Sequence, residues 1–182
     1  MVERNIFAGF GGQGVLTGGL VIAEMAAGKG WNTVWMPAYG PTMRGGKANC
    51  VVKYADVPGE RIGSPIMEEA DILVAMNQPS LDYLEFCRPG VTIFANMHNI
   101  APDYPFPADS DVVRLDCDEL AEQAENPKGQ SLVMVGAMVR RLGLFDPEFA
   151  MTSMDRFFAE KGKSKFQEKN RRAFAAGFEA AK

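Results

Sequence analysis

A glycine-rich segment near the amino terminus constrains this chain more than any other stretch. The apolar run from Asn5 to Ala8 is followed by the spacing Gly9-x-Gly11-x-x-Gly14 and then by a long segment of helical character. This order is typical of a strand–turn–helix unit whose backbone N–H groups surround a phosphate. The spacing alone is a weak signal, so the segments that follow decide what the turn contacts.

The rest of the chain alternates strand-like and helix-like segments, which is typical of α/β proteins. The second and third expected strands are joined by a connection too short for a crossover helix, so they are antiparallel neighbours or belong to different parts of a mixed sheet. We therefore expect an α/β fold, a three-layer Rossmann-like domain with a mixed, mostly parallel sheet. Strands are expected at residues 3–9, 31–36, 48–54, 71–76, 91–95 and 112–115, and helices at 13–28, 79–87, 116–123 and 130–142.

Residues 146–182 are expected to form a helical extension at the carboxyl end. Asp146-Pro147 and Thr152-Ser153 each predict the start of a short helical segment, and Ser164 stands in capping-box spacing with Gln167 before a terminal helix. One face of that helix is basic, which is usual for a solvated face; docking of an acidic partner is the alternative. The basic residues are Lys165, Lys169, Arg171 and Arg172.

Glycines inside two expected helices indicate close packing. Gly18 and Gly19 lie within helix 13–28, where each costs about 1 kcal/mol relative to alanine. Either a neighbouring strand or a partner surface approaches the backbone there. Gly136 allows similar close packing of helix 130–142.

The segment after the second expected strand argues against a dinucleotide cofactor. A dinucleotide-binding domain places an acidic ribose ligand there, about twenty residues beyond the glycines. Residues 36–39, Met-Pro-Ala-Tyr, occupy this position, and no arginine follows immediately for a 2′-phosphate. A free-standing nicotinamide-dependent dehydrogenase remains an alternative, which predicts that the isolated chain binds NAD or NADP.

A second glycine-rich loop occupies residues 39–47. Gly45 and Gly46 allow a positive φ, and Arg44 offers a planar fork of donors suited to a carboxylate or phosphate. Lys47 adds a second cation. The loop is either a simple turn or a site for an anion or an interface.

Carboxamide side chains follow two of the expected strands. Asn77 and Gln78 come after strand 71–76, and Asn96 comes after strand 91–95. Ligands of open α/β sheets bind at these carboxyl ends, so the carboxamides are candidate ligand contacts. Capping of the following segment is the alternative role.

Charge and composition exclude several other classes. A net charge of −4 argues against general affinity for nucleic acid. Cys50, Cys87 and Cys117 form no C-x-x-C pair, so neither an iron–sulfur cluster nor a structural zinc site is expected. His98 has no nucleophile or metal cluster near it and is expected to be a loop residue. Without a membrane span or a signal peptide, the expectation is one cytoplasmic domain over residues 1–182.

Three motifs follow one another along the chain: Gly9-Phe-Gly-Gly-Gln-Gly14, Tyr39-Gly-Pro-Thr-Met-Arg-Gly-Gly46 and Ala75-Met-Asn-Gln-Pro-Ser-Leu-Asp82. Together they resemble a known family, the gamma subunit of 2-oxoacid:ferredoxin oxidoreductases. The similarity extends over nearly the full chain and includes the stretch 126–144. The motifs look most like the 2-oxoglutarate branch, with the branched-chain and other 2-oxoacid branches close behind. Thr42 departs from the commoner pattern, in which an acidic residue often precedes Met-Arg.

The resemblance implies a share in a larger enzyme. Such oxidoreductases decarboxylate a 2-oxoacid on thiamine diphosphate, pass electrons through 4Fe–4S clusters to ferredoxin, and transfer the acyl group to coenzyme A. This chain lacks cluster cysteines and the Gly-Asp-Gly motif of thiamine diphosphate and Mg²⁺ sites. Thiamine-binding alpha and beta subunits and a ferredoxin-like subunit are therefore expected to hold these cofactors, and the chain is not expected to be active alone.

The same resemblance places the chain beside the thiamine-binding subunits and near coenzyme A. The first glycine turn would present backbone donors and a carboxamide, two cations would contact coenzyme A phosphates or an acidic partner loop, and two asparagines would complete the rim. No catalytic or metal-binding residue is expected. A non-catalytic assembly module, whose glycine loops only allow close subunit contact, is the other alternative. The candidate binding residues are Gly11, Gly12, Gln13, Gly14, Arg44, Lys47, Asn77 and Asn96.

Overall fold

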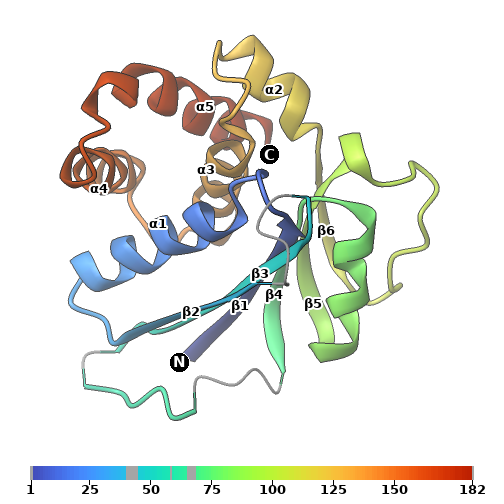
Figure 1. The fold of residues 1–182 in the computed structure, drawn as a ribbon. Helices are drawn as coiled ribbons and strands as arrows, with labels where there is room; N and C mark the ends of the chain where they lie inside the picture. Colours follow the sequence, from blue (N-terminus) through green and yellow to red (C-terminus); the bar gives the residue numbers. More distant parts are fainter. Residues whose placement is uncertain (1, 40–44, 58, 65–68, 182) are drawn as a thin grey trace.

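A six-stranded sheet forms the centre of the fold (Figure 1). The computed structural model describes residues 2–39, 45–57, 59–64 and 69–181. Within them the strand order is β2-β3-β1-β4-β5-β6. The strands are β1 (Val2–Phe10), β2 (Thr33–Tyr39), β3 (Lys47–Ala55), β4 (Ala70–Ala75), β5 (Cys87–Asn96) and β6 (Asp111–Leu115).

Strand directions confirm the expected mixed, mostly parallel sheet. β3 runs antiparallel to both β1 and β2, whereas β1, β4, β5 and β6 pair in parallel. The second and third strands are antiparallel neighbours, because the chain between them is too short for a crossover. The carboxyl ends of the parallel strands consequently meet at one edge of the sheet.

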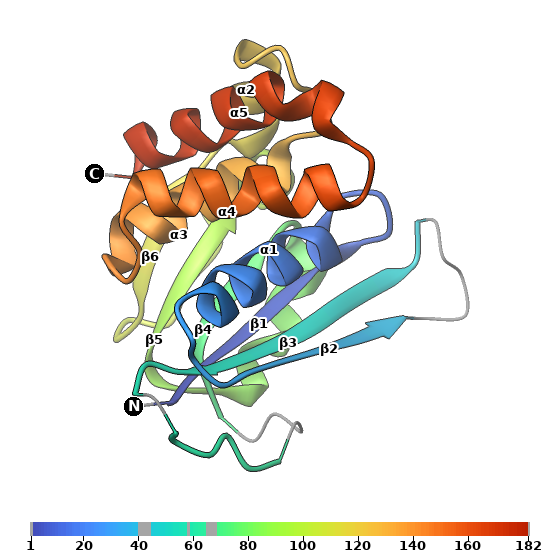
Figure 2. The same cartoon turned by 90° about the vertical axis from the view of Figure 1, so that its left-hand side faces the viewer.

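Helical segments cover both faces of the sheet (Figures 1 and 2). The five α-helices of the described residues share one hydrophobic core with one face, while η1 and the segment up to Phe106 cover the other. The strands alternate accordingly: Phe7 faces the helices, and its neighbours Ile6 and Ala8 face η1. No helix in the described ranges is both long and apolar enough to cross a membrane. The helices are α1 (Val15–Gly28), α2 (Cys117–Gln123), α3 (Gln130–Leu142), α4 (Pro147–Glu160) and α5 (Gln167–Ala180), with 3-10 segments η1 (Gln78–Phe86), η2 (Met97–Asn99) and η3 (Ser164–Phe166).

Helices α3 and α5 cross with their backbones in contact. A Cβ added at Gly136 of α3 would clash with the carbonyl oxygen of Phe174, and one at Gly177 of α5 would clash with that of Val133. The close packing expected of Gly136 is confirmed, and its partner is α5.

The two glycines inside α1 serve the packing of neighbouring elements. A Cβ on Gly19 would clash with the sulfur of Cys50 in β3, and one on Gly18 would lie 3.4 Å from the Cβ of Ser131 in α3. The neighbouring strand, rather than a partner surface, therefore explains why α1 contains Gly19.

Two of the helix starts expected in the carboxyl-terminal region, at Thr152-Ser153 and at Ser164, differ from those in the structure. Asp146 caps α4 as expected, since its carboxylate accepts the N–H of Phe149 at 3.1 Å. However, no helix starts at Thr152-Ser153, because Ser153 is buried and α4 continues past it to Glu160.

The expected capping box at Ser164 is also wrong. Ser164 begins the single turn η3, and α5 starts at Gln167 with no side-chain hydrogen bond capping it. The terminal helix is instead fixed by packing, since Phe174 is buried in the main core.

Candidate functional site

The first glycine turn and the described end of the second loop, Gly45 and Gly46, lie at the edge where the parallel strands end, and their backbones are bonded to each other. The N–H of Gly11 donates to the carbonyl oxygen of Gly46 at 2.9 Å, and the N–H of Gly45 donates to that of Gly11 at 3.3 Å. These bonds continue the pairing of β1 with β3 beyond the strands. The structure thus brings together two of the motifs that sequence reasoning placed in one site.

The first turn requires glycine at two positions. Gly12 and Gly14 have φ values of 109° and 72°, in the left-handed region that favours glycine. A Cβ on Gly12 would meet nothing within 4 Å, whereas one on Gly14 would lie 2.5 Å from the Oγ of Ser131. Gly14 therefore serves both the backbone conformation and the packing against α3.

The turn leads into a helix start with unused donors. The N-cap of α1 is Gly14, no side chain caps the helix, and its first turn contains no acidic residue. The N–H of Gly18 bonds to Gly14 at 2.8 Å, so the N–H groups of the three residues between them have no acceptor within the helix. Together with the helix dipole, such donors favour an anion.

A cleft of about 290 Å³ opens beside these donors. We call it the turn cleft. Its walls are the first glycine turn, the first turn of α1 as far as Thr17, and Ala48 of β3. The cleft places free backbone donors beside an opening, which is the geometry of an anion site.

The carboxamide of Gln13 fastens the turn to the end of β4. Its Oε1 accepts the N–H of Phe10 at 2.7 Å and the Nδ2 of Asn77 at 2.8 Å. Its Nε2 donates to the carbonyl oxygen of Met76 at 3.2 Å. Gln13 therefore holds the turn in its conformation by hydrogen bonds within the protein.

Asn77 and Asn96 are buried, at 3% and 0% exposure, and both cap the segments that follow them. The Oδ1 of Asn77 accepts the N–H of Ser80 at 3.1 Å at the start of η1, which is a 3-10 helix where an ordinary helix was expected. The Oδ1 of Asn96 accepts the N–H of His98 at 3.4 Å at the start of η2. It also accepts the N–H of Cys117 at 3.0 Å, and the Nδ2 of Asn96 donates to Asp118 at 2.8 Å. The capping role, left open in the sequence, is thus the one that both side chains perform here.

Of the two expected cations, Lys47 lies in the described part of the chain. Lys47 begins β3, its side chain is 61% exposed, and its Nζ lies 3.0 Å from Oδ2 of Asp82. This hydrogen bond raises the pKa of Lys47, so the ammonium stays charged at neutral pH. Arg44 lies outside the described residues.

Comparison with known proteins identifies the family. A family model described as pyruvate ferredoxin/flavodoxin oxidoreductase matches residues 4–180. The chain belongs to this family. The resemblance recognised from the three motifs is therefore confirmed, and the helices and strands around the turn cleft are those of this oxidoreductase family.

Two relatives of this family differ in overall length. The chain is 38% identical over 182 residues to ketoisovalerate oxidoreductase subunit VorA of Methanothermobacter thermautotrophicus, covering 98% of this chain and 36% of that protein. It is 29% identical over 178 residues to 2-oxoglutarate synthase subunit KorC of Methanocaldococcus jannaschii, covering 96% and 91%. The chain thus spans about a third of the VorA relative.

Solved structures share the fold over the whole chain. The gamma subunit of a keto/oxoacid ferredoxin oxidoreductase from Geobacter sulfurreducens superposes with a TM-score of 0.80 at 27% identity, covering 98% of both chains. A 2-oxoglutarate:ferredoxin oxidoreductase from Magnetococcus marinus gives 0.81 at 19% identity, covering 99% of this chain and 31% of that one. The second likeness shows a common fold.

The cysteines of this family member are not poised as nucleophiles. Burial raises the pKa of Cys50 to about 12 and that of Cys87 to about 11, and it raises the pKa of Cys117 as well. Such thiols stay protonated at neutral pH. Cys50 and Cys117 are buried and Cys87 is half-buried, so the three side chains belong to the core or its boundary.

His98 lies in the exposed segment η2, as a loop residue, with its Nδ1 3.2 Å from Asp116. The hydrogen bond with Asp116, and the charges of Asp116 and Asp118, raise the pKa of His98. Desolvation opposes ionisation of Asp116, but the N–H of Glu119 and the imidazole of His98 outweigh it and lower the pKa of Asp116. Asp116 caps α2 and Asp118 accepts Asn96, so this group stabilises the start of α2.

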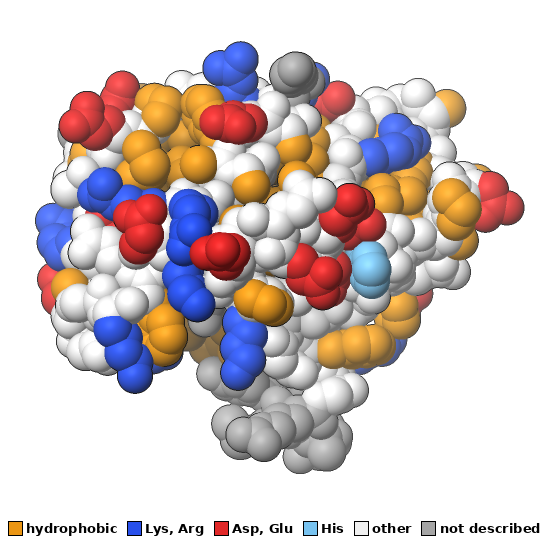
Figure 3. Space-filling model, turned by 90° about the horizontal axis from the view of Figure 1, so that it is seen from above, with side chains coloured by type: hydrophobic (Ala, Val, Ile, Leu, Met, Phe, Trp, Pro, Cys, Tyr) orange, Lys and Arg blue, Asp and Glu red, His pale blue; other side chains and the backbone are white. Residues whose placement is uncertain are grey.

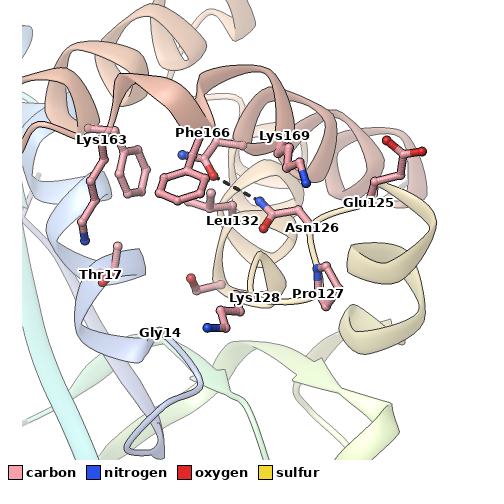
Figure 4. A pocket seen from close by; sticks show the side chains of 13 residues that line it. Gly14, Thr17, Glu125, Asn126, Pro127, Lys128, Leu132, Lys163, Phe166 and Lys169 are labelled. Carbon is pink, nitrogen blue, oxygen red and sulfur yellow. Dashed lines mark hydrogen bonds between the residues drawn. The ribbon is translucent and has the colours of Figure 1, made fainter.

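A larger cavity, of about 400 Å³, lies between α1, α3 and the segment from η3 into α5 (Figure 4). We call it the lysine cavity, after Lys128, Lys163 and Lys169 in its lining. Sequence reasoning missed it: Lys169 was assigned to a solvated helix face, and the other two lysines carried no signal. Its lining comes from four separate segments, which only the tertiary structure brings together.

Proposed function

We propose that the chain is the gamma component of a multi-subunit 2-oxoacid:ferredoxin oxidoreductase, which oxidatively decarboxylates a 2-oxoacid to an acyl-CoA. The family match over residues 4–180 carries this proposal. The Geobacter sulfurreducens gamma subunit, similar over 98% of both chains, supports the gamma role. The chain works in the cytoplasm as part of a complex, with ferredoxin as the electron acceptor.

The cofactors of the reaction belong to the partners in this proposal. Thiamine diphosphate with Mg²⁺ sits in the alpha and beta subunits, and a ferredoxin-like subunit carries the 4Fe–4S clusters. The sequence of this chain has three scattered cysteines, and burial keeps their thiols protonated. This chain alone is therefore inactive in this proposal, and its role is to bind the partner subunits and to help enclose coenzyme A.

Two 2-oxoacids are the candidate substrates. The 38% identity with the VorA subunit favours ketoisovalerate. The motifs of the chain and the KorC relatives, at 28–30% identity, favour 2-oxoglutarate. The higher identity places ketoisovalerate first.

The turn cleft is the proposed contact with coenzyme A. The unused N–H groups at the start of α1 and the backbone of Gly11, Gly12 and Gly14 face its phosphates, and Lys47 and Arg44 supply positive charge. Gln13, Asn77 and Asn96 support the turn from beneath: Gln13 and Asn96 both donate to the carbonyl oxygen of Met76, and Asn77 donates to Gln13. The Magnetococcus marinus enzyme was solved with coenzyme A and succinyl-CoA bound, which makes coenzyme A the first ligand to test.

We expect 2-oxoacid oxidation to require this chain together with its partners. Co-expressing the chain with its thiamine- and cluster-binding partner subunits should give reduction of ferredoxin that depends on both the 2-oxoacid and coenzyme A. Rates with ketoisovalerate and with 2-oxoglutarate identify the branch. The control is the same preparation without this chain, which should lose the coenzyme A-dependent rate. A full rate in that control, or activity of the isolated chain with NAD or NADP, contradicts the proposal.

We expect Arg44→Ala to raise the KM for coenzyme A in the assembled complex by roughly 5- to 20-fold, because a charge-assisted hydrogen bond to phosphate is lost. Lys47→Ala should have a smaller effect, because Asp82 already pairs with this ammonium. Steady-state kinetics measure both. Lys29→Ala, just beyond the opposite end of α1, is the control.

The same variants distinguish coenzyme A binding by the glycine loops from the alternative of a non-catalytic assembly module. If the Arg44 variant assembles poorly but has an unchanged KM for coenzyme A once assembled, the glycine loops serve subunit contact. If both assembly and the KM for coenzyme A stay unchanged, the assignment of Arg44 fails.

A further inference from the structure

The lysine cavity carries charge that the proposed function leaves unused. We propose that it binds a nucleotide-class ligand, that is, a phosphate ester that also carries a flat aromatic ring. A free nucleotide in this cavity goes beyond the oxidoreductase function, whereas the nucleotide end of coenzyme A would rest on the proposed function. The cavity and the turn cleft share Gly14 and Thr17 but otherwise have different walls.

Three lysines without carboxylate partners supply the positive charge. Seven ion pairs are present in the described part of the chain, and none of them involves Lys128, Lys163 or Lys169. These three lysines also make no side-chain hydrogen bond there. Glu125 also lines the cavity, but its carboxylate is paired with Arg172 at 2.7 Å. In Figure 4 the Lys163 side chain points down toward Thr17, with Lys128 near Gly14 and Lys169 on the far side. Three uncompensated cations around one cavity favour a ligand with more than one negative charge.

The starts of two long helices add donors to the same cavity. The N-caps of α1 and α3 are Gly14 and Gly129, neither helix has a side-chain cap, and neither has an acidic residue in its first turn. Gly14 and Thr17 from α1 and Ser131 from α3 line the cavity. The positive ends of both helix dipoles therefore act on whatever occupies it.

A buried amide provides an independent sign of a ligand. Asn170 lines the cavity and is only 6% exposed, and its Nδ2 has no hydrogen-bond partner in the structure. Its Oδ1 accepts the Nδ2 of Asn126 at 3.1 Å, the bond drawn dashed in Figure 4. Buried amide donors are rarely left unpaired, so Asn170 points to an acceptor that a ligand supplies.

The remaining walls suit a flat ring. Leu132, Phe158 and Phe166 form an apolar side, and the Phe166 ring is 43% exposed although it is large and hydrophobic. A cavity of about 400 Å³ lies in the range of small-molecule sites. Seen from above, several lysine and arginine side chains lie on one side of this face, while acidic ones gather next to the single histidine (Figure 3). An anionic ligand is thus drawn to the lysine side of this face.

Titration calorimetry with the full chain tests the proposal, with ADP as the probe. We expect ADP to bind, and Lys128→Ala/Lys163→Ala to weaken its affinity by about tenfold or more, because two charge-assisted contacts are lost. The matched control, Lys29→Ala/Lys161→Ala, removes two charges outside the cavity and should leave the affinity unchanged. Phe166→Ala should weaken ADP but not inorganic pyrophosphate, because it removes only the surface for the ring.

Coenzyme A and dephospho-coenzyme A separate the two sources of such a ligand. If coenzyme A binds more tightly than its dephospho form, and the lysine variant removes that difference, the occupant is the 3′-phosphate end of coenzyme A. If ADP binds as well as coenzyme A, the occupant is a free nucleotide. Both results support the proposal.

Two results overturn it. One is the absence of binding for ADP, coenzyme A and pyrophosphate alike; if the lysine variant then also fails to assemble with the partner subunits, the lysines belong to a subunit interface. The other is binding that the lysine variant leaves unchanged. Thermal unfolding of each variant checks that it is folded. Because the Arg44 variant is assayed by the KM for coenzyme A in the complex and the lysine variant by ADP binding to the chain, failure here and failure of the proposed function are distinguishable.

Discussion

Replacement of Gly177 by alanine is expected to destabilise the chain by about 2–4 kcal/mol, although alanine is the better helix former by about 1 kcal/mol. The reason is steric: the added Cβ clashes with the backbone carbonyl of Val133 in α3. Backbone atoms at a helix crossing cannot rotate away, so α5 must move off α3. Urea denaturation followed by circular dichroism measures the change in unfolding free energy.

The same substitution elsewhere provides the control. Gly28→Ala adds a Cβ at the last residue of α1, where the neighbours are the ends of the Arg156 and Phe149 side chains at 3.2 and 3.4 Å. These ends can shift, so the change in unfolding free energy should be close to zero or stabilising. A Gly177 variant as stable as the Gly28 variant would mean that α3 and α5 do not pack through their backbones.

The packing partner of Gly177 marks the limit of what the sequence predicts. The sequence predicted a helix at residues 130–142 and a terminal helix with a basic face after Ser164. Neither prediction says that the two helices cross at Gly136 and Gly177, because side-chain periodicity names the buried face and not its partner.

Helix boundaries at the carboxyl end show a second limit. Thr152-Ser153 and Ser164 have the side chains of N-caps, yet only Asp146 caps an α-helix in this region. A cap contributes about 1 kcal/mol. Burial of Ser153 and Met154 in the core outweighs that preference and keeps α4 continuous.

For the candidate site, the sequence predicted where the turn and the two asparagines lie but not which groups they bond. The order strand, glycine turn, helix places the turn at the sheet edge, and strand direction brings Asn77 and Asn96 to the same edge. Their hydrogen bonds depend on which backbone groups lie within reach, and this follows from tertiary contacts such as that with Cys117. The lysine cavity had no sequence signal, because its residues meet only once α5 has packed on α3.

Replacement of Gly14 by alanine is expected to cost about 2–4 kcal/mol of stability. Part of this, about 1–2 kcal/mol, comes from holding alanine at a φ of 72°. The rest comes from the contact with Ser131, whose Oγ would lie 2.5 Å from the new Cβ. Gly12→Ala is the matched control, because Gly12 also has a positive φ but would meet no atom within 4 Å. Denaturation of the two variants therefore separates the steric part from the backbone part.

A double-mutant cycle with Ser131→Gly isolates the contact. Removing the serine side chain should recover the steric part of the Gly14→Ala cost and none of the backbone part. No recovery would mean that the turn does not pack against α3. Since Gly14 lines both the turn cleft and the lysine cavity, Gly14→Ala should raise the KM for coenzyme A in the complex and also weaken ADP binding to the chain. Arg44→Ala should raise the KM for coenzyme A. The Lys128/Lys163 variant should weaken ADP binding, and it should change the KM for coenzyme A only if the cavity holds the 3′-phosphate end of coenzyme A. Gly14, like Thr17, lines both sites, so a change there acts on both.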